Sequence, residues 1–503
     1  MSPDAAGDAL PGSVEASATM GAVTSVRAAY LWGGAGNIIK ALLTFGLSVL
    51  LARLLDPSHY GLIGVVLAFV SILMVIQDGG FGQAVVYFDE SEETLPTYHT
   101  IAALGGVAMA LLTWAAAPAL AWFYGMPELR EVAPVLGLCL VFASLTSIPQ
   151  GLLTKELRFK VLSVVETTAG VVAGVTAVAL AFWGAGVWSL VVNLLLGAAI
   201  QAAAVLRLKP GRFTRRPQPE VIWRVVRYGL PLTGSRLLWQ VYLSSDALII
   251  GKLLGSTPLG FYSYALRMAR FLSERVFGIV SRVSFPSFAS MREDRTRLVR
   301  HWFLLTELLG LIHFPAMLAL AMNAEDFVLV LLGEKWLPAV LPLRLLCAAE
   351  AVRSVQVVIP QMVNALGETR AVLRYNILNA VVLPVSFAVG CHLGGLAGVG
   401  LAWMLVYPLL ALRLLKQAAK LTGAPLKGYW RCLRAPALVT VACLAAMLPF
   451  EWLFGAGWTR LVARSAAGGA CYLLSLIVLP DLGRRLLEIA RGRRQVQAPE
   501  LGP

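Results

Sequence analysis

The chain has 503 residues, of which 58% are apolar and only 14% are charged, and its net charge is +14. Soluble proteins hold about 45–50% apolar and about 25% charged residues, so no soluble interior could bury this much apolar sequence. The composition excludes a soluble globular protein. In a soluble chain this positive charge would indicate nucleic-acid binding. In a membrane protein, the distribution of the Lys and Arg residues instead indicates which loops lie on which side of the membrane.

The first 29 residues do not have the pattern of a secretory signal peptide, which needs a basic start and an apolar core. Residues 1–20 carry Asp4, Asp8 and Glu15 but no Lys or Arg. We expect residues 1–29 to form a disordered cytoplasmic tail.

Apolar segments long enough to cross a bilayer, about 20 residues, occur fourteen times. They predict an all-α polytopic membrane protein. The segment 259–281 is the most charged of them, with three arginines and one glutamate. The predicted spans are 30–52, 60–79, 99–122, 132–153, 162–182, 187–206, 229–250, 259–281, 302–322, 339–364, 375–392, 395–413, 433–450 and 461–480.

The distribution of positive charge orients these spans. With the N-terminus in the cytoplasm, the cytoplasmic segments hold 29 of the 42 Lys and Arg residues, and the outer loops hold five. This satisfies the positive-inside rule, and an even number of spans places both termini in the cytoplasm. The five outer cations are Arg53, Arg130, Lys252, Lys335 and Arg460.

Ordered sequence matches indicate a duplicated six-helix unit, with an offset between the copies that grows slowly along the chain. Because six is even, both copies have the same orientation and are related by an axis along the membrane normal. The matches are Ala52–Leu55 with Gly251–Leu254, Gly61 with Gly260 (offset 199), Gly125, Pro134 and Cys139 with Gly333, Pro342 and Cys347 (offset 208), Ile148–Gln150 with Ile359–Gln361, and Ala185–Val187 with Ala397–Val399.

The duplication predicts two pseudo-symmetric lobes with a cleft between them, and two extra C-terminal helices. The expected organisation is a tail (1–29), an N-lobe (30–206), a basic cytoplasmic linker (207–228), a C-lobe (229–416), the last two helices with their preceding loop (417–480) and a basic cytoplasmic tail (481–503).

Cationic and polar side chains recur at spacings of three or four on the first, seventh and eighth spans, so each set shares one helix face. Buried cations are costly in a membrane and usually face a bundle interior or a wet cavity. A cleft lined by Lys and Arg suits an anionic cargo, and the arginine fork suits phosphate. The candidate cavity residues are Asn37, Lys40, Arg236, Gln240, Arg267 and Arg270.

Ion pairing and helix packing are the alternative explanations. Arg270 could pair with Glu274, and Glu350 with Arg353, because residues three or four apart are neighbours on a helix. Glycines Gly170 and Gly174, and the cluster Gly394, Gly395 and Gly398, predict close helix packing. Three arginines near span ends are expected to extend to the membrane surface; they are Arg275, Arg344 and Arg464.

Five acidic residues in the spans are candidate proton or sodium sites, although helix ends and ion pairs could account for most of them. They are Asp78, Glu166, Asp246, Glu307 and Glu350.

Nothing in the sequence predicts an enzyme or a bound cofactor. The six cysteines form no CxxC pair, and the five histidines form no HExxH, so neither disulfides nor a metal site are indicated. Walker A, GxSxG and strand-linked GxGxxG motifs are also missing. Coupling to the membrane potential, H⁺ or Na⁺ stays open.

Several motifs are familiar as a set. They are Leu51–Pro57 with Tyr60-Gly61, Asp78–Ala84, Ile148–Gln150, Lys155–Lys160, Gly184–Trp188, Asp246–Gly255 and Leu259–Ala265. Together, over about residues 30–420, they resemble bacterial Wzx-type polysaccharide exporters, in the colanic-acid-exporter-like branch of the MOP (multidrug/oligosaccharidyl-lipid/polysaccharide) superfamily. The chain departs from that branch at Gly79-Gly80, where a Leu often precedes the second glycine, and in its long N-terminal tail.

The resemblance implies a flippase of the bacterial inner membrane. It would move an undecaprenyl-pyrophosphate-linked oligosaccharide from the cytoplasmic to the periplasmic leaflet for exopolysaccharide, capsule or O-antigen (lipopolysaccharide) synthesis. The diphosphate would lie on the buried cations and the prenyl tail in lipid, while the lobes rock. Implied partners are the lipid-linked oligosaccharide, the bilayer and polysaccharide polymerase or co-polymerase proteins, without nucleic acid.

Two other classes of function stay open. A drug or cation exporter of the same superfamily would prefer a cationic cargo, against which the predicted cationic cleft argues. A membrane glycan polymerase, ligase or glycosyltransferase generally carries a sizeable extramembrane catalytic loop, whereas the outer loops here are short, the longest being the stretch 323–338.

Overall fold

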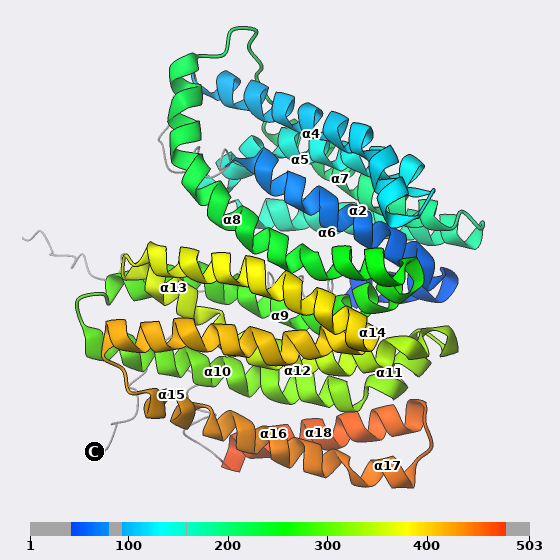
Figure 1. The fold of residues 1–503 in the computed structure, drawn as a ribbon, viewed down its shortest axis with the longest axis vertical. Coiled ribbons are helices and arrows are strands. Elements are labelled where there is room, and N and C mark those ends of the chain that lie inside the picture. Colours follow the sequence, from blue (N-terminus) through cyan, green and yellow to red (C-terminus); the bar gives the residue numbers. More distant parts are fainter. Residues whose placement is uncertain (1–41, 80–92, 157, 479–503) are drawn as a thin grey trace, which may run out of the picture.

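The computed structural model describes residues 42–79, 93–156 and 158–478, and these residues are almost entirely helical, without any strand (Figure 1). This confirms the all-α class. The helices are Leu42–Leu54, α2 (Pro57–Asp78), α4 (Leu95–Tyr124), α5 (Leu129–Lys155), α6 (Phe159–Phe182), α7 (Val187–Leu208), α8 (Pro219–Leu254), α9 (Ser256–Ser290), α10 (Arg295–Met322), α11 (Ala324–Leu331), the 3₁₀ helix η1 (Glu334–Ala339), α12 (Val340–Gln356), α13 (Val358–Ala365), α14 (Thr369–Thr422), α15 (Leu426–Cys432), α16 (Arg434–Met447), α17 (Pro449–Leu453) and α18 (Trp458–Val478).

Ten helices in the described part of the chain are long and apolar enough to cross a membrane. The count of fourteen is therefore not confirmed, although each predicted span overlaps a helix. The helix α9 is not among the ten, and α12 has only 17 residues. The long helix α14 joins two predicted spans across Gly394 and Gly395, where the backbone is not helical.

Close glycine packing occurs at two of the five glycines for which the sequence predicts it, Gly174 and Gly398. In α14, a Cβ on Gly398 would lie 1.8 Å from the Gly390 carbonyl oxygen, so the two halves of this helix meet backbone to backbone. In α6, a Cβ on Gly174 would lie 2.7 Å from the Leu47 side chain of the first helix, and one on Gly170 would lie 3.8 Å from Thr44. The Gly174 contact leaves no room for a side chain, whereas the distance at Gly170 is ordinary van der Waals contact. Nothing lies within 4 Å of a Cβ on Gly394 or Gly395, so close packing is wrong as a prediction at these three positions.

The helices form two bundles, and α8 passes from one to the other (Figure 1). Helices α2 and α4–α7 pack together in the first bundle, and α9, α10 and α12–α14 in the second. The start of α8 packs on the first bundle, where Val221 joins Tyr98, Ala102 and Ile148 in a small core. Its second half packs on α14, while α2 contacts both α8 and α9. The region between α2, α8 and α9 therefore joins the bundles.

The last helices lie on the far side of the second bundle, where α16 packs on α10 and α18 packs on α16 (Figure 1). Large apolar side chains cover much of the outer surface, as expected where helices face lipid. Trp122, Trp183 and Trp452, at the ends of α4, α6 and α17, are each more than 80% exposed. Exposed tryptophans at helix ends are typical of a membrane interface.

Candidate substrate cavity and buried ion pairs

A small cavity of about 90 Å³ lies between α2, α7 and α9, at the junction of the bundles. Its polar side chains include Arg267, Tyr60, Asn193 and Ser263. It is lined by Tyr60, Ile63, Gly64, Leu67, Leu190, Asn193, Leu194, Ser263, Tyr264 and Arg267.

Arg267 is exposed, and among the described residues it has no hydrogen-bond or ion-pair partner. Its charge acts on the neighbouring phenols of Tyr60 and Tyr264. The Tyr60 hydroxyl is itself buried without a hydrogen-bond partner in the described structure. An unpaired cation beside an unpaired hydroxyl is an arrangement that an anionic oxygen could complete.

The polar stripe of α8 faces α2, as the helical spacing predicts. Arg236 Nη1 lies 2.7 Å from Asp78 Oδ2, and both side chains are only partly exposed. One turn further along α8, Gln240 donates from Nε2 to Ser71 Oγ of α2 at 3.0 Å and to Ser244 Oγ at 2.9 Å. The structure thus brings a predicted cavity cation and a predicted ion-coupling acid together as one ion pair between the bundles.

Arg270 lies inside the second bundle rather than at the cavity. Its Nε is 3.3 Å from Glu350 Oε1, and Arg353 Nε is 3.3 Å from Glu350 Oε2. The expected pair of Glu350 with Arg353 is confirmed, whereas the described partner of Arg270 is Glu350 of α12 and not Glu274. Glu350 is 4% exposed, and the two arginines that face this buried carboxylate are 16% and 17% exposed.

Asp246 of α8 is fully buried beside this network. Its Oδ2 accepts hydrogen bonds from Tyr262 OH at 2.7 Å and Trp403 Nε1 at 3.1 Å, and its Oδ1 accepts one from the Ala247 amide at 2.7 Å. Arg270 is the cation that interacts with it electrostatically. Asp246, Arg270, Glu350 and Arg353 therefore form a charge-balanced set in the core of the second bundle.

The remaining predicted site residues are dispersed. Asn37 and Lys40 lie outside the described residues. Glu166 is exposed on α6 of the first bundle, and Glu307 is partly buried on α10 of the second. Neither lines the Arg267 cavity. No cluster of three or more His, Cys, Asp or Glu in the described ranges could hold a metal ion.

The sequence patterns do not predict the buried ion-pair network around Asp326. Asp326 of α11 is 0% exposed, and Arg460 Nε lies 2.7 Å from its Oδ2. Arg464 Nη1 lies 3.5 Å from the same oxygen, and its Nη2 lies 3.0 Å from Glu451. The expectation that Arg464 extends to the membrane surface is wrong, because this side chain is 3% exposed.

Arg344 agrees better with the expectation of a side chain that extends to the membrane surface. It is 46% exposed, and its pair with Glu325 is long, at 3.8 Å. The side chain of Arg275 is not part of the described structure. The signal for the Asp326 network is the adjacent pair Glu325-Asp326 in one predicted outer loop, opposite arginines spaced four apart at the start of the last span.

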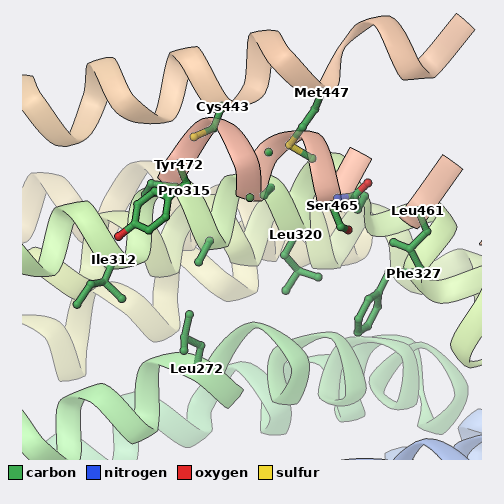
Figure 2. A pocket seen from close by; sticks show the side chains of 15 residues that line it. Leu272, Ile312, Pro315, Leu320, Phe327, Cys443, Met447, Leu461, Ser465 and Tyr472 are labelled. Carbon is green, nitrogen blue, oxygen red and sulfur yellow. The ribbon is translucent and has the colours of Figure 1, made fainter. Parts of the chain in front are cut away.

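An apolar groove of about 460 Å³ is lined by residues of α9, α10, α16 and α18 (Figure 2). Leu272 of α9 stands on one side, with α16 and α18 opposite it across α10. Asn323 and Ser465 are among the few polar residues in its wall. The lining residues are Leu272, Ile312, Pro315, Ala316, Ala319, Leu320, Asn323, Phe327, Cys443, Met447, Leu461, Ser465, Gly468, Gly469 and Tyr472.

Several solved structures share the fold, among them a flippase and a multidrug transporter. The lipid II flippase MurJ, in an inward closed conformation, has a TM-score of 0.72 at 13% identity and covers 89% of this chain and 98% of its own. A multidrug resistance MATE family transporter of the MOP superfamily, in an inward-facing conformation, has a TM-score of 0.63 at 14% identity and covers 76% and 96%. The chain thus shares its two-bundle fold with these two transporters.

Sequence relatives come from polysaccharide biosynthesis. The lipopolysaccharide biosynthesis protein WzxC of Escherichia coli K12 is 26% identical over 394 residues, 76% of this chain and 79% of its own. The succinoglycan biosynthesis transport protein ExoT of Rhizobium meliloti is 28% identical over 474 residues, 91% of this chain and 94% of its own. A family model described as "Polysaccharide biosynthesis protein" matches residues 50–341. That match covers more than half of the chain, which therefore belongs to the polysaccharide biosynthesis protein family.

Proposed function

We propose that this protein is a flippase that carries a polyprenyl-pyrophosphate-linked oligosaccharide, of the undecaprenyl type, from the cytoplasmic to the outer leaflet of a bacterial inner membrane. Membership in the polysaccharide biosynthesis family supports the pathway. The fold shared with MurJ and the MATE transporter supports transport by alternating access between the two bundles. Sugar hydroxyls are too costly to bring unsatisfied into hydrocarbon, so such a cargo needs a polar path.

The observation that carries this proposal is Arg267 in the cavity between the bundles, which has no hydrogen-bond or ion-pair partner among the described residues. The other described cavity candidates have partners: Arg236 pairs with Asp78, Arg270 with Glu350, and Gln240 with two serines. Arg267, with the orphan hydroxyl of Tyr60 and the polar groups of Asn193 and Ser263, is free to receive a pyrophosphate. Arginine binds two phosphate oxygens at once because its guanidinium is a planar fork.

The apolar groove beside α16 and α18 suits the other part of the cargo. A polyprenyl chain is a flexible hydrocarbon, and the groove presents almost only apolar side chains between helices that face lipid. We assign the groove to the prenyl tail. The pyrophosphate and sugars would then occupy the interbundle path while the tail stays in apolar surroundings.

The membrane potential favours this direction of transport. With the inside negative, moving about two negative charges outward gains roughly 4–5 kcal/mol per 100 mV. A drug or cation exporter is the alternative within the same fold. An unpaired arginine in the cavity opposes a cationic cargo by like-charge repulsion.

The test measures the sidedness of lipid-linked oligosaccharides in a strain that lacks the chromosomal copy. Expression of the unchanged chain should deliver them to the outer leaflet, and Arg267→Ala should leave them facing the cytoplasm. Arg267→Lys should restore part of the transport. Arg292→Ala is the matched control, because Arg292 is 68% exposed and its only described ion pair is a 3.9 Å contact with its neighbour Glu293.

The proposed function fails if lipid-linked units reach the outer leaflet normally without this protein. If transport depends on the protein but Arg267→Ala transports as well as Arg292→Ala, the cavity assignment alone fails. Membrane content of each variant, measured in the same samples, separates lost transport from lost insertion.

A further inference from the structure

At one end of the molecule, each bundle donates a cation to the end of a helix in the other bundle. Arg53, in the last turn of the first helix, donates from Nε to the Leu331 carbonyl of α11 at 2.6 Å and from Nη2 to the Val330 carbonyl. Lys252, in the last turn of α8, donates from Nζ to the Phe123 carbonyl of α4 and lies 4.4 Å from the centre of the Phe123 ring. Carbonyls in the last turn of a helix lack partners within the helix and carry partial negative charge, so they attract cations.

The two contacts are equivalent by the internal duplication. Arg53 and Lys252 are 199 positions apart, which is the offset that relates Gly61 to Gly260. The acceptors Phe123 and Leu331 are 208 positions apart, which is the offset that relates Gly125 to Gly333. Both donor and acceptor therefore recur in each repeat, and the contact is made once in each direction.

Two glycines make the same reciprocal contact between α2 and α9. A Cβ on Gly61 would lie 1.7 Å from the Ser256 carbonyl oxygen, and a Cβ on Gly260 would lie 1.8 Å from the Pro57 carbonyl oxygen. Pro57 and Ser256, which begin α2 and α9, are again 199 positions apart. The bundles therefore touch backbone to backbone at this end.

A third contact belongs to one repeat alone. Trp336 of η1 donates from Nε1 to the Ala52 carbonyl at 2.8 Å, and Lys335 donates to the Leu55 carbonyl at 2.8 Å. The buried ring of Trp336 packs against Tyr60 and Tyr264, with centroids 5.4 and 4.9 Å apart. These two tyrosines also line the Arg267 cavity, so the closed end and the cavity share a wall.

We propose that Arg53 and Lys252 are a symmetric pair of latches that hold this end of the interbundle path closed, and that releasing them opens the cavity to the side on which they lie. Neutral carbonyl acceptors suit a contact that must break and re-form, because water can replace each hydrogen bond at little net cost. A buried carboxylate partner would make release much harder. Four of the five cations that the topology places outside thus have structural partners, three of them across the bundles.

The experiment labels a Ser263→Cys reporter in the cavity with a membrane-impermeant maleimide in the full-length chain, added from either side. Labelling of Arg130→Cys identifies the latch side, because Arg130 is an exposed outer cation of the same end. The chain without the added cysteine supplies the baseline from its six native thiols.

In the unchanged latch, labelling from the latch side should be slower than from the opposite side. Arg53→Gln and Lys252→Gln should each speed latch-side labelling about two- to five-fold, as expected for loss of one cation at a helix end. The double variant should speed it further, whereas Lys252→Arg and the control Arg130→Gln should label at the original rate. Arg53→Lys keeps the charge but not the two-nitrogen fork, so its rate should lie between those of the unchanged chain and Arg53→Gln.

The proposal is overturned if the Gln variants label no faster than Arg130→Gln. It is also overturned if the unchanged chain labels equally fast from both sides, a result that needs no latch variant to fold. Neither measurement requires the cargo. The latch can therefore be disproved while the proposed function stands, and the proposed function can be disproved while the latch stands.

Discussion

The Asp78 carboxylate, on the last residue of α2, lies 2.7 Å from the guanidinium of Arg236 on α8. The first residues of the same helix α2 meet α9 through Gly61 and Pro57. The helix α2 is thus held against neighbouring helices at both of its ends, by a charged pair at one and by backbone contacts at the other. A rocking motion of the bundles would have to break these two contacts in turn.

The first prediction concerns the Asp78–Arg236 pair. Because the two side chains are 30% and 42% exposed, solvent screens the pair, and we expect a coupling energy of about 0.2–1 kcal/mol. Thermal unfolding of Asp78→Asn, Arg236→Gln and the double variant in detergent gives this value as a double-mutant cycle. Strictly additive effects would contradict a direct pair.

The second prediction concerns the buried carboxylate of Asp246. Asp246→Asn replaces one carboxylate oxygen by an amide NH₂, which cannot accept a hydrogen bond. Either Tyr262 OH and Trp403 Nε1 or the Ala247 amide then loses its acceptor. Leaving buried donors without acceptors should lower the free energy of unfolding by about 1–3 kcal/mol. Tyr262→Phe removes one donor and leaves the carboxylate two others, so it should lower the free energy of unfolding by less than Asp246→Asn does. Equal stability of Asp246→Asn and the unchanged chain would show that these hydrogen bonds contribute nothing.

The sequence predicts helix positions well because apolar length alone defines a membrane span. Each predicted span overlaps a helix, and the polar stripe with Arg236 and Gln240 faces α2 as its spacing indicates. The sequence does not predict which side chains on different helices form ion pairs. Helix spacing predicts Glu274 as the ion-pair partner of Arg270. In the structure the partner is Glu350 of α12, because the packing of α9 on α12 determines which carboxylate lies near Arg270.

Arg464 shows the same limit of local reasoning. Its position near a span end predicts a side chain that reaches the membrane surface, whereas a buried carboxylate on α11 holds it in the protein. A single sequence does not show which distant carboxylate will face which arginine. The spacing predicts Arg267 as a member of a polar stripe, but only the structure separates it, without a partner in the described part of the chain, from paired neighbours such as Arg270.

The third prediction follows from the Asp326 network. Asp326→Asn leaves the buried guanidinium groups of Arg460 and Arg464 without their shared carboxylate, and breaking a buried pair costs about 3–5 kcal/mol. We expect a correspondingly large drop in the free energy of unfolding. The matched control is Arg344→Ala, whose half-exposed pair with Glu325 has a separation of 3.8 Å. Loss of this exposed pair should cost less than about 1 kcal/mol. Similar losses for both variants would show that burial does not govern this network.

The fourth prediction concerns Gly61, where α2 meets the backbone of α9. In Gly61→Ala the new methyl carbon would lie 1.7 Å from the Ser256 carbonyl oxygen, and a backbone atom cannot rotate away as a side chain can. The bundles must therefore separate slightly at this end, and overpacking of this kind costs about 1–3 kcal/mol.

The expected result is faster labelling of the Ser263→Cys reporter from the latch side in Gly61→Ala. Gly260→Ala should behave in the same way, because its Cβ meets Pro57 as the Cβ of Gly61 meets Ser256. The control is Gly105→Ala in α4, where nothing lies within 4 Å of the added carbon; it should gain about 0.4–1 kcal/mol in stability without any change in labelling.

If Gly61→Ala labels like Gly105→Ala, the backbone contact does not hold this end closed. If Gly61→Ala and Gly260→Ala differ from each other, the two repeats do not share the closure equally, and the symmetric arrangement of the latch would have to be abandoned.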